Sequence, residues 1–226
     1  MLTLASLAYA ISIFIDLSSY FTKYYVQDKQ NIRYLLSLIN IYQYSARAFV
    51  LIFTPIAAYY TETVKDIDLV WLMILLCHIF TVLLILPLFS VKFGQIFSRL
   101  TINLLNFFFG RSKELHVNIL KPNSNDKVST KTKVTIFMMS LIAGFFFSIS
   151  ITFLYYVSFY YPQKALTLSS YTQIINLVGV MLYILFLDPK IMSSIDKHSG
   201  ISEIVCLATG RMVAHCVLII ILFIIH

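Results

Sequence analysis

The chain has 226 residues, of which 59% are hydrophobic and 12% are charged, and its mean hydropathy is +0.85. Soluble domains are about 45–50% apolar and about 25% charged, so this composition excludes a soluble globular protein. Long unbroken apolar runs favour helices over the alternating pattern of a membrane β-barrel. The formal net charge of +7 we attribute to basic loops, and we expect no nucleic acid partner. We predict an all-α, polytopic membrane helical bundle that forms one domain over residues 1–226.

Six apolar runs are long enough to cross a bilayer, which takes about 20 predominantly apolar residues. No basic segment precedes the first run, since the first lysine is Lys23, so we expect a membrane span there and not a cleaved signal peptide. No internal repeat is visible in the sequence, although an inverted repeat that has diverged beyond recognition remains open. The predicted spans cover residues 2–20, 34–60, 69–89, 134–160, 167–187 and 201–225.

One long basic link, residues 91–133, joins the third and fourth runs. Its first half places apolar residues at helical spacing with polar residues between them, which predicts an amphipathic helix on the cytoplasmic interface or an extension of the third span. Such a helix is either an interface anchor or a gate or docking surface for an anionic lipid headgroup. The polar stretch 121–133 is expected to be a loop. The apolar residues of the predicted amphipathic helix are Phe93, Ile96, Phe97, Leu100, Leu104 and Phe107.

Basic residues are distributed unequally between the two sides of the predicted bundle. The first, third and fifth links carry thirteen Lys and Arg residues (3, 8 and 2), whereas the second and fourth carry only Lys65 and Lys164. Cytoplasmic loops of membrane proteins hold the excess of Lys and Arg. We therefore predict that both termini lie outside the cytoplasm.

Several predicted spans carry ionisable residues, and Arg47 is near the middle of the second run. A guanidinium at that depth costs at least ~2.5–3.5 kcal/mol. We therefore expect either a charged partner elsewhere in the chain or a transported substrate that binds it. Arg211 is in the middle of the sixth run, and Asp16 in the first run can pair with one of the two arginines. Guanidinium groups bind phosphate in a bidentate manner. The surplus positive charge therefore predicts a central, water-accessible cationic cavity for a phosphate-bearing substrate.

Two histidines within the spans, His78 and His215, have three possible roles. They are substrate ligands, groups that couple transport to protons, or structural hydrogen-bonding residues. Each is adjacent to a cysteine, Cys77 or Cys216, but neighbours on a helix point about 100° apart and do not chelate a metal. We expect no metal and no cofactor.

Two prolines interrupt apolar runs. Pro55 lies in the outer third of the second run, where it predicts a passive bend or a hinge near the outer mouth. Asp188 and Pro189 close the fifth run at the cytoplasmic surface, either as a loop signal or as a gate in which Asp188 pairs with Lys190 or Lys197. No catalytic motif such as HExxH or GxSxG is present, so we do not expect an enzyme.

Four segments of the chain, in the order given below, resemble the bacterial lipid II flippase Amj family. The chain is similar to a divergent member of that family. The stretch 15–20 (IDLSSY) resembles the first-span motif, and 39–56 resembles the second span through the spacing of Asn40, Arg47 and Pro55. Residues 167–189 resemble the fifth span, with Asn176 and the closing Asp188. TGRM at 209–212 resembles the Gly-Arg of the last span, at Gly210 and Arg211.

This resemblance implies a flippase that moves undecaprenyl-pyrophosphate-linked peptidoglycan precursor, lipid II, to the outer leaflet of the bacterial cytoplasmic membrane. Its partners are this polyprenyl-pyrophosphate-linked saccharide and membrane lipids. The alternatives are a secondary transporter for a small solute or ion, and a non-transporting membrane scaffold. The expected substrate-binding residues are Arg47, Arg211, Asn40, Asn176, His215 and His78, with Asp16, Asp188 and Pro55 as charge partner or gate and Lys23, Lys29 and Arg99 at the cytoplasmic mouth.

Overall fold

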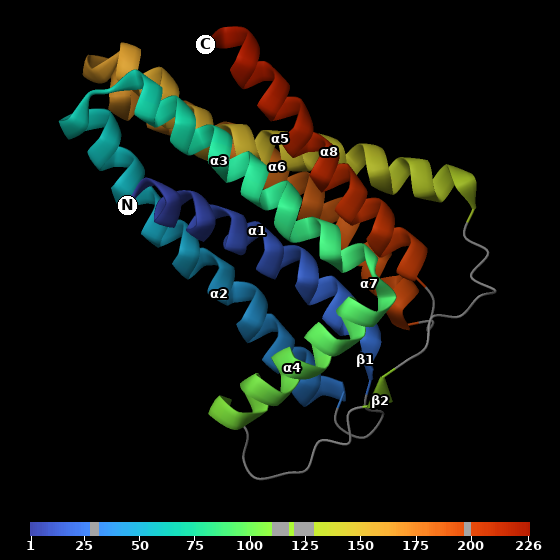
Figure 1. The fold of residues 1–226 in the computed structure, drawn as a ribbon. Helices are drawn as coiled ribbons and strands as arrows, with labels where there is room; N and C mark the ends of the chain where they lie inside the picture. Colours follow the sequence, from blue (N-terminus) through green and yellow to red (C-terminus); the bar gives the residue numbers. More distant parts are fainter. Residues whose placement is uncertain (28–31, 110–117, 120–128, 197–199) are drawn as a thin grey trace.

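The computed structural model describes residues 1–27, 32–109, 118–119, 129–196 and 200–226 (Figure 1). Helices make up nearly all of this part. Two-residue strands, β1 (Val26–Gln27) and β2 (Asn118–Ile119), pair antiparallel with Val26 opposite Ile119. The α-helices are α1 (Leu2–Tyr25), α2 (Ile32–Tyr59), α3 (Ile67–Ile85), α4 (Val91–Phe109), α5 (Thr130–Tyr160), α6 (Ala165–Leu182), α7 (Asp188–Asp196) and α8 (Ile201–Ile225).

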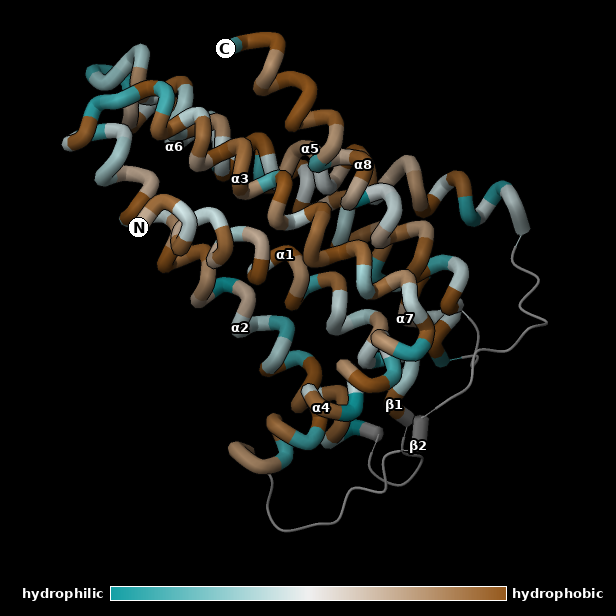
Figure 2. The backbone as a smooth tube through the Cα atoms, viewed as in Figure 1, coloured by the Kyte–Doolittle hydropathy of each residue, from teal (hydrophilic) through white to brown (hydrophobic). Residues whose placement is uncertain are grey.

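Six continuous helical segments of the described chain are long and apolar enough to cross a membrane. This confirms the predicted all-α polytopic bundle, a multi-pass membrane protein. Hydrophobic residues run along these helices (Figure 2). The segments cover Leu2–Tyr25, Arg33–Val64, Ile67–Phe89, Thr130–Tyr160, Pro162–Asp196 and Ile201–Ile225.

The spanning helices form two groups of three. In the first group α1 packs along both α2 and α3, and in the second α5 packs along both α6 and α8. The groups meet mainly where α3 packs on α8, and Figure 1 shows α3 and α8 beside each other. Each group therefore has its first helix at its centre.

Small residues and buried hydroxyl groups bring the central helices close to their neighbours. Ser6 on α1 donates a hydrogen bond to the carbonyl oxygen of Met73 on α3 at 2.9 Å, and Ser140 on α5 donates to that of Leu207 on α8 at 2.7 Å. A Cβ on Gly210 of α8 would lie 2.6 Å from the carbonyl oxygen of Phe137. Close backbone approach and interhelical hydrogen bonds are the forces that hold helices together where lipid removes the hydrophobic driving force.

The predicted amphipathic helix is present as α4, which crosses the ends of α1 and α2 (Figure 1). A 3₁₀ turn over Leu86–Phe89 and Ser90 separate it from α3, so it is not an extension of the third span. Phe97 packs against Phe14 of α1, with ring centroids 5.1 Å apart. The rest of the apolar stripe faces away from the bundle, with Phe107 82% exposed. The part of the predicted loop at 121–128 lies outside the described residues. The loop prediction is wrong for residues 130–133, which are the first turn of α5 (Thr130–Tyr160).

The prediction that Asp188 and Pro189 are a loop signal is wrong, because the helix does not end there. The helix continues to Asp196, because a π-helical turn over Tyr183–Leu187 precedes the proline. In this turn the N–H of Asp188 donates to the carbonyl oxygen of Tyr183, five residues back. The shifted hydrogen-bond register accommodates the N–H that proline lacks.

Pro55 does not interrupt its helix either. The α-helix continues through this residue to Tyr59, and a π-helical turn over Tyr60–Val64 follows it. Pro55 is exposed, and the helix loses only the hydrogen bond that proline cannot donate.

We predict that Gly210→Ala destabilises the bundle, because the new Cβ overlaps the Phe137 carbonyl oxygen and forces α5 and α8 apart. Overpacking of this kind costs about 1–3 kcal/mol. The midpoint of thermal unfolding in detergent should fall. Val217→Leu adds bulk on the exposed face of the same helix and should leave that midpoint unchanged. An unchanged midpoint for Gly210→Ala would contradict the close packing.

Candidate functional site

A cavity of about 410 Å³ lies between the two helix groups. Residues of α1 and α2 line one side, and residues of α5, α6 and α8 together with the start of α7 line the other. The charged side chains on its wall are three cations and two carboxylates, so the wall has a surplus of positive charge. They are Lys23, Arg47, Arg211, Asp16 and Asp188.

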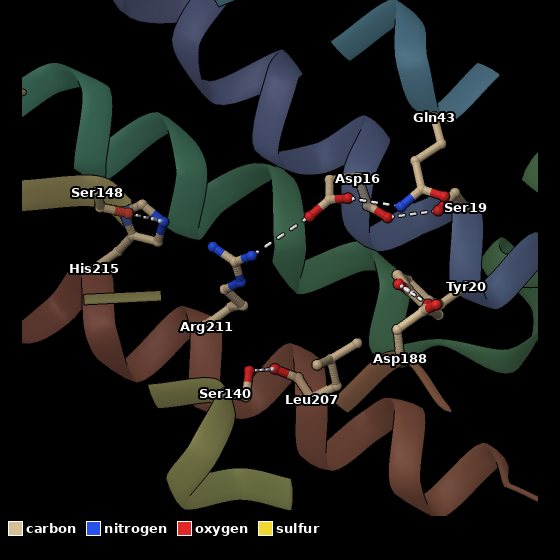
Figure 3. A network of polar contacts seen from close by, with 10 residues as sticks. All are labelled: Asp16, Ser19, Tyr20, Gln43, Ser140, Ser148, Asp188, Leu207, Arg211 and His215. Carbon is tan, nitrogen blue, oxygen red and sulfur yellow. Dashed lines mark hydrogen bonds and ion pairs between the residues drawn. The ribbon is translucent and has the colours of Figure 1, made fainter. Parts of the chain in front are cut away.

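Arg211 is the deepest cation of the cavity and is 4% exposed. Its Nη2 lies 3.5 Å from Oδ2 of Asp16, which forms an ion pair between α8 and α1 (Figure 3). The guanidinium also packs on the rings of Phe147 and Tyr183, 5.4 and 5.0 Å from their centroids. Such contacts with aromatic faces stabilise a desolvated cation.

A glycine on α5 leaves space for the Arg211 side chain, and two hydrogen-bond donors of its guanidinium are unused. A Cβ at Gly144 of α5 would lie 2.8 Å from Cδ of Arg211, so only glycine leaves room for the arginine stem. Within the described ranges, Nε and Nη1 of Arg211 have no hydrogen-bond partner. A buried donor without a partner is costly. This arginine is therefore ready to donate to a ligand oxygen in the cavity.

Asp16 connects Arg211 to a chain of polar groups on α1 and α2. Gln43 Nε2 donates to Oδ1 of Asp16 at 3.0 Å (Figure 3). Lys23 Nζ donates to Oε1 of Gln43 at 3.1 Å. The Lys23 ammonium also lies 5.0 Å from the ring centroid of Tyr20. This network orients the amide of Gln43 and holds the Asp16 carboxylate between α8 and α2.

A second polar contact joins α1 to the start of α7. Tyr20 Oη donates to Oδ1 of Asp188 at 2.5 Å, and the Tyr20 ring meets that of Tyr183 at a centroid distance of 5.9 Å. Asp188 thus has a phenol partner inside the cavity. Within the described residues Asp188 forms no ion pair with Lys190. The alternative partner, Lys197, lies outside those residues, so its pairing with Asp188 stays a prediction.

Arg47 differs from Arg211 because it is exposed and has no acidic partner within the described residues. Its guanidinium carbon lies 6.0 Å from the ring centroid of Tyr44, one helical turn earlier on α2. Both arginines line the same cavity. Arg47 therefore contributes a positive charge that no carboxylate within the described chain neutralises.

The cavity is bordered by α2 and α6, which are the outer helices of their groups. Each packs mainly on its own central helix, and the two are not packed along each other. Tyr44 on α2 is 67% exposed, and Ile184 in the π-helical turn that follows α6 is 58% exposed, although both line the cavity. The wall is thus open sideways between these two helices, at the depth of the apolar spans.

His78 and His215 form a separate buried pair between α3 and α8. Their Nδ1 atoms lie 2.9 Å apart, so one ring donates its proton to the other. Ser148 Oγ is 3.5 Å from Nε2 of His215, and Thr152 Oγ1 is 3.4 Å from Nε2 of His78. Tyr9 packs edge-on against both rings. This pair links the two helix groups and does not line the cavity.

The predicted site residues divide into two sets. The structure brings Asp16, Lys23, Asn40, Arg47, Asp188 and Arg211 to the cavity. It does not bring His78, His215, Asn176, Pro55 or Arg99 there, and Lys29 lies outside the described residues. The distinction arises because mid-span depth says nothing about which face of a helix points inward. Arg99 was predicted in the link after the third span and not within a span, and it is exposed on α4.

The lining residues that the sequence interpretation overlooked include four that contact the charged groups of the cavity: Tyr20, Gln43, Phe147 and Tyr183. Helical spacing identifies two of them. Tyr20 is four residues after Asp16, and Gln43 is three residues after Asn40 and four before Arg47, so each shares a helix face with predicted residues. Phe147 and Tyr183 are aromatic residues in apolar runs, and only the fold distinguishes them from the core.

We predict that Asp16→Ala lowers the unfolding midpoint, since it leaves the buried Arg211 charge without its carboxylate. The double variant Asp16→Ala/Arg211→Met should be more stable than Asp16→Ala alone, with a coupling of about 0.5–3 kcal/mol. Thermal unfolding of the three variants measures this. Asp68→Ala, at a carboxylate whose side chain is 78% exposed, is the control. Purely additive effects would contradict the ion pair.

For the histidine pair, we predict that His78→Leu destabilises the protein by about 1–3 kcal/mol, because His215 then has an unpaired buried nitrogen. His78→Asn, whose amide reaches the position of Nδ1, should retain much of the stability. Chemical or thermal unfolding compares the two variants. Equal losses for leucine and asparagine would show that packing, and not the hydrogen bond, holds this site.

Comparisons with protein-family models, with curated proteins and with solved structures found no match to this chain. The assignment of a function therefore depends on the geometry and charge of the cavity.

Proposed function

We propose that this protein is a flippase for an anionic lipid-linked saccharide of the lipid II class. It moves the polyprenyl-pyrophosphate-linked peptidoglycan precursor from the inner to the outer leaflet of a bacterial cytoplasmic membrane. The observation that carries the proposal is that Arg47 and Arg211 line one cavity. Arg211 is held by Asp16 yet has free donors, and Arg47 has no acidic partner within the described residues. This arrangement suits phosphate oxygens, which guanidinium groups bind in a bidentate manner.

The lateral opening between α2 and α6 supports a lipid cargo. A lipid tail can stay among the acyl chains while its headgroup enters the cavity. The volume of about 410 Å³ is near the lower end of ligand pockets, which span about 300–1,000 Å³. We therefore assign the cavity to the phosphate end of the headgroup, and the saccharide extends towards the end of the bundle that carries α4.

The charge distribution supports the direction of movement. The end of the bundle at α4 is the end at which the first, third and fifth links lie, and these links carry most of the Lys and Arg residues. We propose that this end faces the cytoplasm and that both termini face away from it. Lys23 then stands at the cytoplasmic mouth of the cavity.

Two alternatives make different demands on the cavity. A non-transporting scaffold predicts arginines that are fully paired within the protein and no cavity, and the unpaired Arg47 favours transport over this reading. A secondary transporter for a small solute uses the same charges but needs no lateral opening to lipid. The exposed Tyr44 and Ile184 at the rim favour the lipid cargo.

We predict that Arg47→Ala strongly reduces the exposure of lipid II on the outer leaflet in bacterial cells that lack their other flippases. Loss of a charge-assisted hydrogen bond, about 1.5–3 kcal/mol, weakens binding by about tenfold or more. Arg47 is exposed, so the variant should fold normally. Arg99→Ala, at an exposed arginine outside the cavity, is the matched control and should retain function.

The assay compares surface-accessible lipid II at equal protein levels, and Arg211→Ala is expected to lose function as well. Normal exposure with both Arg47→Ala and Arg211→Ala would refute the flippase proposal. Solute uptake by proteoliposomes down an imposed gradient, without lipid movement, would instead establish the small-solute alternative.

A further inference from the structure

The two helix groups are related by a constant shift in residue number. Ser6 donates to the Met73 carbonyl oxygen and Ser140 donates to that of Leu207, and in each pair the partners are 67 residues apart. The second bond therefore repeats the first after 134 residues (140 − 6 and 207 − 73). In both cases the bond joins the first and third helices of a group. The same local packing thus recurs at the same shift.

The start of the third helix and one proline in each group follow the same shift. The third helix begins at Ile67 in the first group and at Ile201 in the second (201 − 67 = 134). Pro55 and Pro189 also correspond (189 − 55 = 134). The sequence LILPLF at 84–89 corresponds to LIIILF at 218–223. One shift without gaps therefore relates all three helices of the first group to those of the second.

The cavity lies where equivalent residues of the two groups face each other. Three of its lining pairs are related by the same 134 residues: Ile13 and Phe147, Ala46 and Val180, and Val50 and Ile184. Each group has three spans, an odd number, so the second group crosses the membrane in the opposite direction to the first. Binding sites at the interface of inverted repeats are the usual arrangement in secondary transporters.

The two groups differ at the equivalent prolines. In the second group the π-helical turn over Tyr183–Leu187 ends two residues before Pro189. In the first group the π-helical turn over Tyr60–Val64 follows Pro55. The cavity wall reaches Asp188 but not Thr54, its equivalent in α2 (188 − 54 = 134). Near Thr54, Phe53 packs against Tyr155 of α5 with a centroid distance of 5.8 Å. The cavity therefore extends to the α4 end, and the opposite end is filled by side chains.

We propose that residues 2–89 and 136–223 form an inverted structural repeat, and that the cavity opens alternately at its two ends as the halves exchange these geometries. In the opposite state the first half has its π-helical turn before Pro55, and the second half is α-helical through Pro189. Thr54 then lines the cavity as Asp188 does in this structure. This inference holds for any cargo, and its test uses no substrate.

Spin labels at equivalent exposed positions of α2 and of the helix formed by α6 and its π-helical turn test the exchange. One pair, Leu51→Cys with Tyr171→Cys, reports the end away from α4. The equivalent pair, Ser37→Cys with Leu185→Cys, reports the α4 end, because 37 and 51 correspond to 171 and 185. All four positions are exposed. The background carries Ala at the three free cysteines, Cys77, Cys206 and Cys216.

Pro55→Ala and Pro189→Ala should shift the label distances in opposite directions. Pro189→Ala removes the reason for the π-helical turn of the second half, so the pair at the far end should lengthen and the pair at the α4 end should shorten. Pro55→Ala removes the cause of the π-helical turn that the first half has in the opposite state. It should therefore favour the state seen in this structure. Pulsed electron paramagnetic resonance in phospholipid vesicles measures both pairs. Parallel shifts from the two substitutions, or no shift in either pair, would overturn the proposal.

Thiol labelling gives a second test in which both prolines are retained. Thr54→Cys should react with a membrane-impermeant maleimide applied from the side away from α4. Ile52→Cys, at an exposed position of the same helix, faces lipid and should stay unreactive. Equal reactivity of the two cysteines would contradict the opening at the far end.

Discussion

The burial of one guanidinium group determines how the bundle is built. Arg211 is almost fully buried within the apolar spans, where an unpaired charge is costly. Three elements satisfy it at once: Asp16 from α1, the rings of Phe147 and Tyr183, and the space left by Gly144 on α5. Because Asp16 and Arg211 come from different helix groups, the ion pair adds to the packing of α3 on α8 that joins the groups. Substituting any one of the residues in these three elements removes part of the environment that stabilises the buried Arg211 guanidinium.

Arg47 has the opposite role. It gains no carboxylate within the described chain and is exposed at the open side of the cavity. A charge near mid-span that is neither buried nor paired needs water or an anionic ligand. The pair of arginines therefore combines a fixed, desolvated donor with an accessible one. A phosphate group entering between α2 and α6 meets Arg47 first and can then reach the free donors of Arg211.

The spans and the amphipathic helix were predictable from sequence because apolar length and helical period reflect contact with lipid directly. The π-helical turn at Tyr183–Leu187 was not predictable, since a proline can end a helix or be accommodated by a shifted hydrogen-bond register. The histidine pair shows the same difficulty. The mid-span depth of His78 and His215 suggested that they line the cavity. The helix faces of α3 and α8 instead direct the two rings towards each other. The inverted repeat is hidden in sequence because lipid-facing positions accept many apolar residues.

The sequence by itself determined the number of spans, their approximate limits, the unequal distribution of basic residues, and the requirement that Arg47 and Arg211 find anionic partners. These follow from composition and from the cost of charge in hydrocarbon, which are properties of each segment alone. The tertiary structure decided which arginine Asp16 pairs with, that both arginines share one cavity, and that this cavity lies between two related halves. Those features depend on the rotation of each helix about its own axis, which packing sets through Gly144, Gly210 and the serine-to-carbonyl hydrogen bonds.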